Sequence, residues 1–230
     1  MVSVQTLRGR KQPFRVNSWI LDSGAFSELS LYGHYRFPVE EYAEQIVRWR
    51  KCGTLQCAVS QDYMCEPSIL ERTGQSVEAH QDYSIERYLE LRDLVRNVYI
   101  LPVLQGYSPA SYVDHIRAYG QALEPSAWVG VGSVCKRNGN PDAIEDVLLA
   151  IKAERPDLRL HAFGIKKLAL ERPTVRALLY SCDSMAWSFD GRMDGDGHDP
   201  RQALEYCADI ELILKEPQFI QPQLFSWWVS

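Results

Sequence analysis

The feature that most constrains the fold is a short apolar run that recurs along the chain and closes each time on a polar residue or a glycine. In the first run, residues 19–21 lead directly into Asp22, Ser23 and Gly24. An uninterrupted apolar run of this kind is typical of a strand buried on both faces of a parallel sheet. The polar residues then stand where the backbone leaves the sheet, which predicts a working site at the strand ends. The later runs are residues 55–60, 98–104, 128–132, 158–163 and 178–182.

Helical patterns separate these runs. Residues 38–51 place apolar side chains at helix spacing, with Glu40 and Glu41 in the first turn and Arg48 and Lys51 in the last, an order that suits the helix dipole. Strand and helix alternate without a linker or a low-complexity segment, which predicts a parallel sheet with crossover helices. The other predicted helices are residues 84–95, a segment opened by Ser108 and Pro109, and residues 141–154, 168–179 and 199–214.

Two architectures fit this alternation, an open doubly wound sheet and a closed (β/α) barrel. In an open sheet polar residues gather at one switch point, whereas in a barrel every strand ends at one shared mouth. Here every predicted strand ends in a polar residue or a glycine, and no G-x-G-x-x-G or Walker motif is present. We therefore predict an α/β fold, a (β/α)8 TIM-type barrel formed by a single domain over residues 1–230. Only residues 2–7 precede the strand that ends at Asp22, so the barrel is expected to be incomplete or improvised at its N-terminus.

Composition narrows the function classes. The chain has 230 residues, of which 46% are hydrophobic, and it has no run of about 18 apolar residues that would span a membrane. Residues 1–15 lack the apolar core of a secretory signal, and the six cysteines stand singly, so we predict reduced thiols and a cytoplasmic location. The net charge of −5 argues weakly against a nucleic-acid partner without excluding one, because a local basic face matters more than the total.

Several motifs, in order along residues 19–188, resemble the tRNA-guanine transglycosylase superfamily. The stretch Asp22-Ser23-Gly24-Ala25-Phe26 is similar to that family's D-S-G-G-F motif, and Val103-Leu104-Gln105-Gly106 is similar to its V-Q-G stretch. Residues 129–133 resemble its glycine-rich base-binding loop, residues 160–166 its next strand, and residues 182–184 its nucleophile strand. In detail, the sequence of these motifs most resembles the short DpdA-type proteins, which are implicated in placing 7-deazaguanine bases into DNA. The stretches that carry this closer resemblance are residues 61–67, 80–81, 132–137 and 183–188.

The resemblance implies a base-exchange transglycosylase with two catalytic carboxylates. It assigns Asp183 as the nucleophile that captures C1′, and Asp22 as the acid/base that passes a proton to the leaving guanine and takes one from the incoming base. This division fits the chemistry, because exchange with retention of configuration requires a covalent glycosyl intermediate. An Asp that follows a strand is otherwise a capping or turn residue, which is the structural alternative for Asp22 taken alone.

The resemblance also implies a pocket for a guanine-like ring, with Asp62 and Gln105 on its Watson–Crick edge and a glycine loop that lets the backbone approach it. For His161, which lies in an apolar strand, a hydrogen-bonded core residue is the alternative. The stacking candidates are Tyr63, Met64 and Phe163. The predicted substrate-binding residues are Ser23, Gly24, Phe26, Gln61, Asp62, Gln105, Gly106, Gly130, Gly132, Ser133, His161, Gly164 and Lys166. The predicted contacts to a nucleic-acid backbone are Lys136, Arg137 and Arg192.

We expect a 7-deazaguanine-type base and a nucleic acid, first of all DNA, as partners, and no cofactor. RNA, tRNA or a free nucleoside are alternative substrates, a catalytically inactive nucleobase-binding protein is the alternative function, and a homodimer is left open. No metal site is predicted, because the C-terminal region offers Cys207 alone where the tRNA enzymes have three clustered cysteines and a histidine. The acidic residues 190–199 lack EF-hand spacing and are predicted to form a solvated loop.

Overall fold

The computed structural model describes residues 1–137, 139–188 and 199–215. Its strand pairings are all parallel, and neighbouring strands follow the order of the chain, β1-β2-β3-β4 in one sheet and β5-β6-β7-β8 in the other. This order differs from the doubly wound one, in which the succession of strands reverses at a switch point. The strands are β1 (Val2–Ser3), β2 (Ser18–Asp22), β3 (Thr54–Val59), β4 (Ile100–Leu101), β5 (Val103–Leu104), β6 (Trp128–Val131), β7 (Arg159–Ala162) and β8 (Leu179–Cys182).

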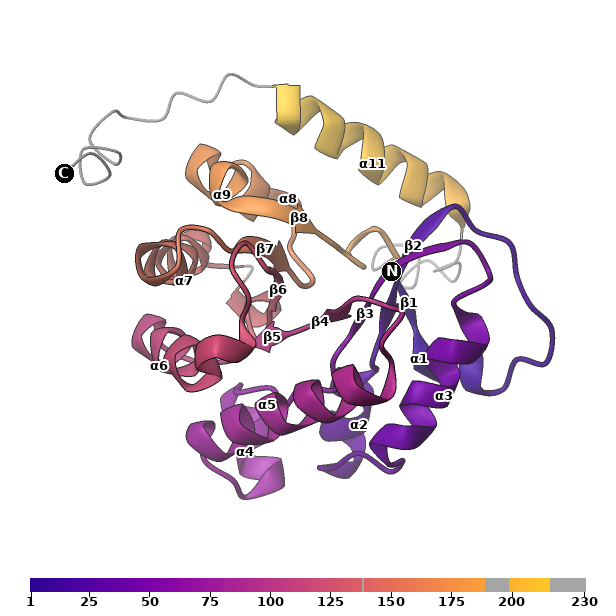
Figure 1. The fold of residues 1–230 in the computed structure, drawn as a ribbon. Helices are drawn as coiled ribbons and strands as arrows, with labels where there is room; N and C mark the ends of the chain where they lie inside the picture. Colours follow the sequence, from indigo (N-terminus) through magenta and orange to yellow (C-terminus); the bar gives the residue numbers. More distant parts are fainter. Residues whose placement is uncertain (138, 189–198, 216–230) are drawn as a thin grey trace.

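Pro102 separates β4 from β5 within one extended segment. β4 pairs with β3 and β5 pairs with β6, so this segment joins the two sheets. Proline has no N–H and therefore interrupts the ladder. Its carbonyl still accepts the N–H of Gly130 at 2.8 Å, which keeps the segment paired with β6. Figure 1 shows β3, β4, β5 and β6 following one another through the centre of the molecule.

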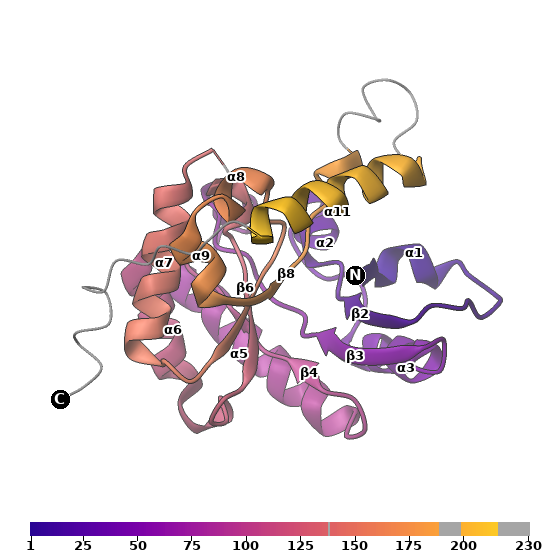
Figure 2. The same ribbon diagram turned by 90° about the horizontal axis from the view of Figure 1, so that it is seen from above.

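Helices cover the outer side of the curved strand layer, as both views show (Figures 1 and 2). The last described helix, α11 (Pro200–Lys215), packs beside α8 and places Ile210 and Ile213 against the core. No helix of the described residues is long and apolar enough to cross a membrane. The other helices are α1 (Val4–Arg8), α2 (Ala25–Tyr32), α3 (Val39–Trp49), α4 (Pro67–Thr73), α5 (Val77–Leu94), α6 (Pro109–Tyr119), α7 (Pro141–Glu154), α8 (Lys167–Leu170) and α9 (Pro173–Leu178).

The strands bury two different faces. Alternate residues such as Leu21, Ala58 and Leu104 belong to the large core between strands and helices. The residues between them form a separate apolar cluster on the inner face, made of Cys57, Val59, Leu101 and Val103 with Ile20, Trp128 and Phe163 packed against it. Because residues two apart in a strand share a face, the inner face continues at the strand ends into polar residues and glycine. Those positions are Asp22, Gln61, Gln105, Gly132 and Asp183.

All six predicted strand segments contain strand, but residues 98–104 divide at Pro102 into β4 and β5. The helices differ from prediction in three respects. The helix predicted at residues 168–179 is wrong, since it divides into α8 and α9 where Pro173 cannot continue a helix and instead begins the next one. The helix predicted from residue 84 begins at Val77, with the Ser76 hydroxyl accepting from the Ala79 N–H. Helices α1, α2 and α4 were not predicted, and none is longer than eight residues. Helices α2 and α4 end on a glycine with positive φ, Gly33 and Gly74.

The fold is therefore a parallel α/β fold whose strands run in barrel order. Residues 2–3 supply a short strand, β1, which pairs with β2 through Val2–Leu21 and Ser3–Asp22. Within the described ranges no ladder joins β8 to β1, so closure of the barrel and its single-domain organisation stay predictions. Residues 190–198 of the predicted acidic loop lie outside the described residues.

Candidate active site

Asp22 closes β2 as a partly buried carboxyl. Its Oδ2 accepts the N–H of Gly24 at 3.1 Å, and Gly24 takes a left-handed conformation with φ of 75°. A Cβ on Gly24 would lie 2.8 Å from the Gln5 side chain, so glycine fits this turn on two counts. Burial raises the pKa of Asp22 to about 6, the charge of Asp183 adds to the rise, and the Ser3 hydroxyl and the Gly24 amide oppose it. This carboxyl can hold a proton near neutral pH.

Asp183 follows β8 directly and meets a different environment. Its Oδ1 accepts the N–H of Gly164 at 3.2 Å and lies 3.4 Å from His161 Nε2. Its main-chain carbonyl accepts the N–H of Ile165 at 2.9 Å, which ties the ends of β7 and β8 together. The side chain is 18% exposed and lines a cavity of about 370 Å³ that also includes Trp187. Oδ1 of Asp183 therefore faces both the Gly164 N–H and the ring of His161.

Between these two carboxyls in the order of the strands lies a connected set of polar side chains, Asp62, Gln105 and Ser133, which we call the polar wall. Gln105, fully buried after β5, donates from Nε2 to Asp62 Oδ2. Its Oε1 accepts the Ser133 hydroxyl at 2.8 Å, and Ser133 Oγ accepts the N–H of Cys65 at 3.1 Å. These bonds fix which side of the Gln105 amide carries the donor. Burial raises the pKa of Asp62 to about 7, the hydrogen bond from Gln105 opposes it, and the charge of Asp22 adds to it. Asp22, Asp62 and Asp183 therefore share one electrostatic site.

Gly130 in β6 and Gly132 directly after it are required by close packing on the inner face. A Cβ on Gly132 would collide with the side-chain amide of Gln105. A Cβ on Gly130 would lie 2.5 Å from the ring of Phe163. Any larger residue would therefore displace the polar wall or the aromatic ring beside it. The carbonyl of Gly132 accepts the hydroxyl of Tyr112 at 2.7 Å, so α6 holds this loop from behind.

The backbone of Gln105 is held by two buried side chains. Gln81 Nε2 donates to the Gln105 carbonyl at 2.7 Å, and the Gln105 N–H donates to His115 Nδ1 at 2.8 Å. The ring proton of His115 is then on Nε2, which lies 3.1 Å from the Gln81 carbonyl. Burial lowers the pKa of His115 to about 4, so the ring is neutral. His115 was not predicted, because its role depends on where α6 packs.

A comparison with protein families finds a match over most of the chain. The model of the family DpdA, described as DeoxyPurine in DNA protein A, matches residues 2–209. The chain belongs to this family. Membership indicates a DNA-modifying transglycosylase and confirms the resemblance to the DpdA-type proteins. No curated protein matches the chain.

Two further buried polar residues near this candidate site have no partner of normal hydrogen-bond geometry among the described residues. Both amide atoms of Gln61, which was predicted, are in this state. So are both carboxyl oxygens of Glu66, which was not predicted. Burial raises the pKa of Glu66, and the positive charges of Lys136 and Arg137 oppose the rise. Such groups are exceptions in folded proteins and are therefore candidates for ligand contacts.

Other predicted residues lie at the rim or away from the site. Phe26 is 52% exposed on the first turn of α2, with Lys136 Nζ 4.8 Å from its ring centroid. The Arg137 guanidinium lies 5.1 Å from the ring centroid of Tyr107 and donates to the carbonyls of Ser133 and Tyr107. Arg137 therefore ties two loops together, whereas Lys136 is exposed. Arg192 lies outside the described residues.

The three stacking candidates separate in the structure. Phe163 packs on the inner face of the strands. Tyr63 and Met64 belong to another cluster with Leu29 and Ile69, between α2 and α4. Lys166 is exposed at the N-cap of α8, on a surface cavity of about 560 Å³ that it shares with residues of α11. Among the three stacking candidates, the inner face therefore favours Phe163.

The described residues contain no group of three or more His, Cys, Asp or Glu that could hold a metal ion. Cys52, Cys57 and Cys65 are buried free cysteines. Burial raises the pKa of the Cys57 thiol to about 12, so it behaves as a small core residue rather than as a nucleophile. The absence of zinc stays a prediction.

Proposed function

We propose that this protein exchanges guanine in DNA for a 7-deazaguanine derivative, through a covalent bond between Asp183 and C1′ of the sugar. The observation that carries the proposal is a pair of electrostatically coupled carboxyls in unlike environments. Burial raises the pKa of Asp22 to about 6, whereas the Gly164 N–H and His161 stand against one oxygen of Asp183. Two carboxyls in such unlike environments can take the separate roles of proton carrier and nucleophile.

The exchange then proceeds in two half-reactions. A carboxylate oxygen of Asp183 attacks C1′, the C1′–N9 bond breaks, and its electron pair goes to the leaving guanine, which takes a proton from Asp22. In the second half, the incoming base loses its N9 proton to the Asp22 carboxylate and attacks C1′. The bond between Asp183 and C1′ breaks, and the electron pair returns to Asp183. Two inversions at C1′ give retention of configuration.

Base recognition follows from the polar wall. A guanine-like ring presents both donors and acceptors, and Asp62, Gln105 and Ser133 form a connected set of such groups. Gln61 adds an amide that has no other partner in the described part of the chain. A buried polar site of this kind discriminates strongly, because a ligand that lacks a complementary group leaves a site group unpaired. The inner face beside Gly130 supplies Phe163 as an apolar surface for the ring.

A base in duplex DNA must leave the stack before C1′ is exposed to Asp183, at a cost of roughly a few kcal/mol. The rim offers two exposed aromatic rings beside basic residues, Phe26 with Lys136 and Tyr107 with Arg137. Such pairs suit an unpaired strand, because bases stack on the rings while cations face the phosphates. We assign Lys136 to phosphate contact and Arg137 chiefly to holding the loops.

The test is capture of the covalent intermediate. Protein incubated with guanine-containing DNA and then denatured should migrate as a protein–DNA adduct, and addition of a 7-deazaguanine base should release it. Asp183→Asn should form no adduct, because an amide cannot capture C1′. Asp93→Asn is the matched control, since Asp93 is an exposed aspartate in the last turn of α5, before β4, whereas Asp183 directly follows β8.

Three outcomes would contradict the proposal. Adduct formation by Asp183→Asn at the wild-type rate would remove Asp183 from the mechanism. Base binding by the wild-type protein without any adduct on DNA, RNA or nucleoside would favour the inactive nucleobase-binding protein. An adduct with RNA or a free nucleoside but none with DNA would move the substrate to one of the alternatives. Mass spectrometry of nucleosides from treated DNA then identifies the inserted base.

A further inference from the structure

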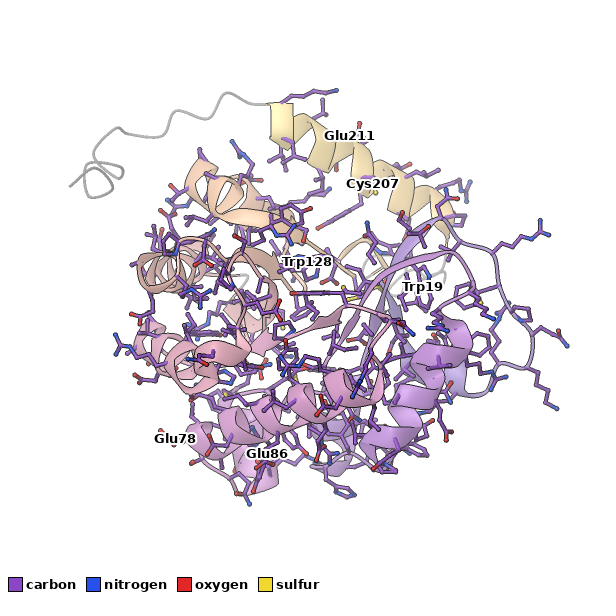
Figure 3. All side chains as sticks on the ribbon, in the orientation of Figure 1. Trp19, Glu78, Glu86, Trp128, Cys207 and Glu211 are labelled. Carbon is purple, nitrogen blue, oxygen red and sulfur yellow. The ribbon has the colours of Figure 1, made fainter. Side chains whose placement is uncertain are left out.

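A line of hydrogen-bonding side chains on the inner face of β6, β7 and β8 ends at Asp183. Trp128 Nε1–H donates to Ser181 Oγ at 3.1 Å, and Ser181 Oγ lies 2.9 Å from His161 Nδ1. His161 Nε2 in turn lies 3.4 Å from Asp183 Oδ1. His161 and Ser181 are register partners across β7 and β8, so the sheet itself sets them side by side. Figure 3 shows Trp128 in the middle of the molecule, among the strands.

The chemistry of these groups fixes where the protons lie. An indole N–H can only donate, so Ser181 Oγ accepts from Trp128. The Ser181 hydroxyl can then give its own proton to His161 Nδ1, which places the ring proton on Nε2, facing Asp183. The other tautomer would set a nitrogen lone pair against a carboxylate oxygen. His161 is 1% exposed and its Nε2 has no closer partner in the described ranges, so Asp183 is the acceptor available to it.

We propose that His161 is a positioning residue for Asp183, which holds Oδ1 and leaves Oδ2 to bond with C1′. The inference rests on the proposed function, in which Asp183 is the nucleophile. The Gly164 N–H reaches the same oxygen at 3.2 Å, so the donors found among the described residues converge on Oδ1. Trp128 and Ser181 keep the ring of His161 in the orientation that this contact needs. The separation of 3.4 Å is long for such a bond and shortens when substrate completes the site.

This contact acts unequally on the two half-reactions. When Oδ2 bonds to C1′, Asp183 becomes an ester and loses its negative charge. When that bond breaks, the electron pair returns to Asp183, and the N–H of His161 binds the re-forming carboxylate more strongly than it bound the ester. Loss of the donor therefore slows release of the sugar more than its capture. The adduct should accumulate, which a purely structural defect would not cause.

The experiment compares His161→Phe with His161→Gln. Phenylalanine keeps a ring against Phe163 and Trp128, whose centroids lie 4.9 and 6.0 Å from that of His161, but it has no N–H. Glutamine carries an N–H donor at the position of Nε2. In His161→Phe, release of the adduct by added base should slow by about 10- to 100-fold, the effect of losing one hydrogen bond to a charged group, while the adduct fraction rises. His161→Gln should recover most of the wild-type release rate.

The inference would be overturned if His161→Phe released the adduct at the wild-type rate. It would also be overturned if His161→Phe lost capture and release equally and His161→Gln did not restore them. A second measurement needs no variant at His161. The 15N resonances of the His161 ring should show Nδ1 unprotonated and Nε2 protonated, and Ser181→Ala should weaken this preference. A proton on Nδ1 in the wild-type protein would equally overturn it. Failure of this inference can be distinguished from failure of the proposed function, because only the latter appears as adduct formation by Asp183→Asn.

Discussion

The pKa of Asp22 makes a quantitative prediction about pH. Burial raises this pKa to about 6, so the fraction of Asp22 that carries a proton is about one half at pH 6, one tenth at pH 7 and one hundredth at pH 8. If Asp22 protonates the leaving guanine, only the protonated fraction forms the adduct. The first-order rate of adduct formation should therefore fall about tenfold between pH 7 and pH 8.

The second half-reaction should show the opposite dependence. Asp22 must then be a carboxylate to take the N9 proton of the incoming base, so release should rise with pH and level off above about pH 6. Rapid mixing with saturating DNA, followed by denaturing electrophoresis, measures the first rate. Addition of base to isolated adduct measures the second.

Asp22→Asn is the control for both rates. It cannot carry the proton, so adduct formation should fall by roughly 10²- to 10⁴-fold and lose its dependence on pH. Asp62 has a pKa raised to about 7, so DNA must be kept saturating at each pH to separate binding from chemistry. A wild-type rate that stays constant from pH 6 to pH 8 under these conditions would refute the role of Asp22 as the acid.

Three further predictions concern stability, the pocket and the rim. Burial raises the pKa of Glu28, but hydrogen bonds from Arg36 outweigh it and lower this pKa from 4.5 to about 2. Glu28→Gln should thus reduce the free energy of unfolding, measured by urea titration, by about 2–3 kcal/mol at pH 7. The difference should be present above pH 4.5 and be lost as the pH falls toward 2. Gly132→Ala should displace the Gln105 amide and weaken base binding at least tenfold by calorimetry, with the fold retained by circular dichroism. Lys136→Ala should weaken DNA binding and reduce the slope of log Kd against log salt concentration by about 1, with free-base binding unchanged.

The strands were predictable because their signal is local. An apolar run between glycine, proline and polar residues has few alternatives, and the ends of β2, β3 and β6 fell within two residues of prediction. The helices carried less information where they were short. Helix α2 starts inside the Asp22 motif with Gly24 as its N-cap, and no side chain caps it, so neither periodicity nor a capping residue announced it. The break at Pro173 is predictable from the sequence, because proline cannot continue a helix; the helix predicted across it ignored this signal.

The same difference between local signals and tertiary packing applies to the residues of the candidate site. The positions of Asp22, Gln105 and Asp183 at strand ends could be predicted, because each follows an apolar run directly and belongs to a recognisable motif. The line from Trp128 to Asp183 could not be predicted, because it depends on the register that sets His161 beside Ser181. Nor could the support of Gln105 by His115, since that requires knowing which face of α6 meets the strand ends. Sequence order supplies the residues, whereas register and helix packing decide their partners.

The unpaired groups of the pocket carry a physical consequence for the free protein. Gln61 and Glu66 are buried without partners of normal geometry in the described part of the chain. A buried polar group that stays unpaired costs about 1–3 kcal/mol of folding free energy. Ser133 adds a positive φ of 56°, unusual for a residue with a side chain. These costs fall at the C-terminal ends of the strands, beside the buried apolar core. A ligand that pairs these groups returns part of that free energy, so binding of the correct base should stabilise the fold more than its contact area alone would suggest.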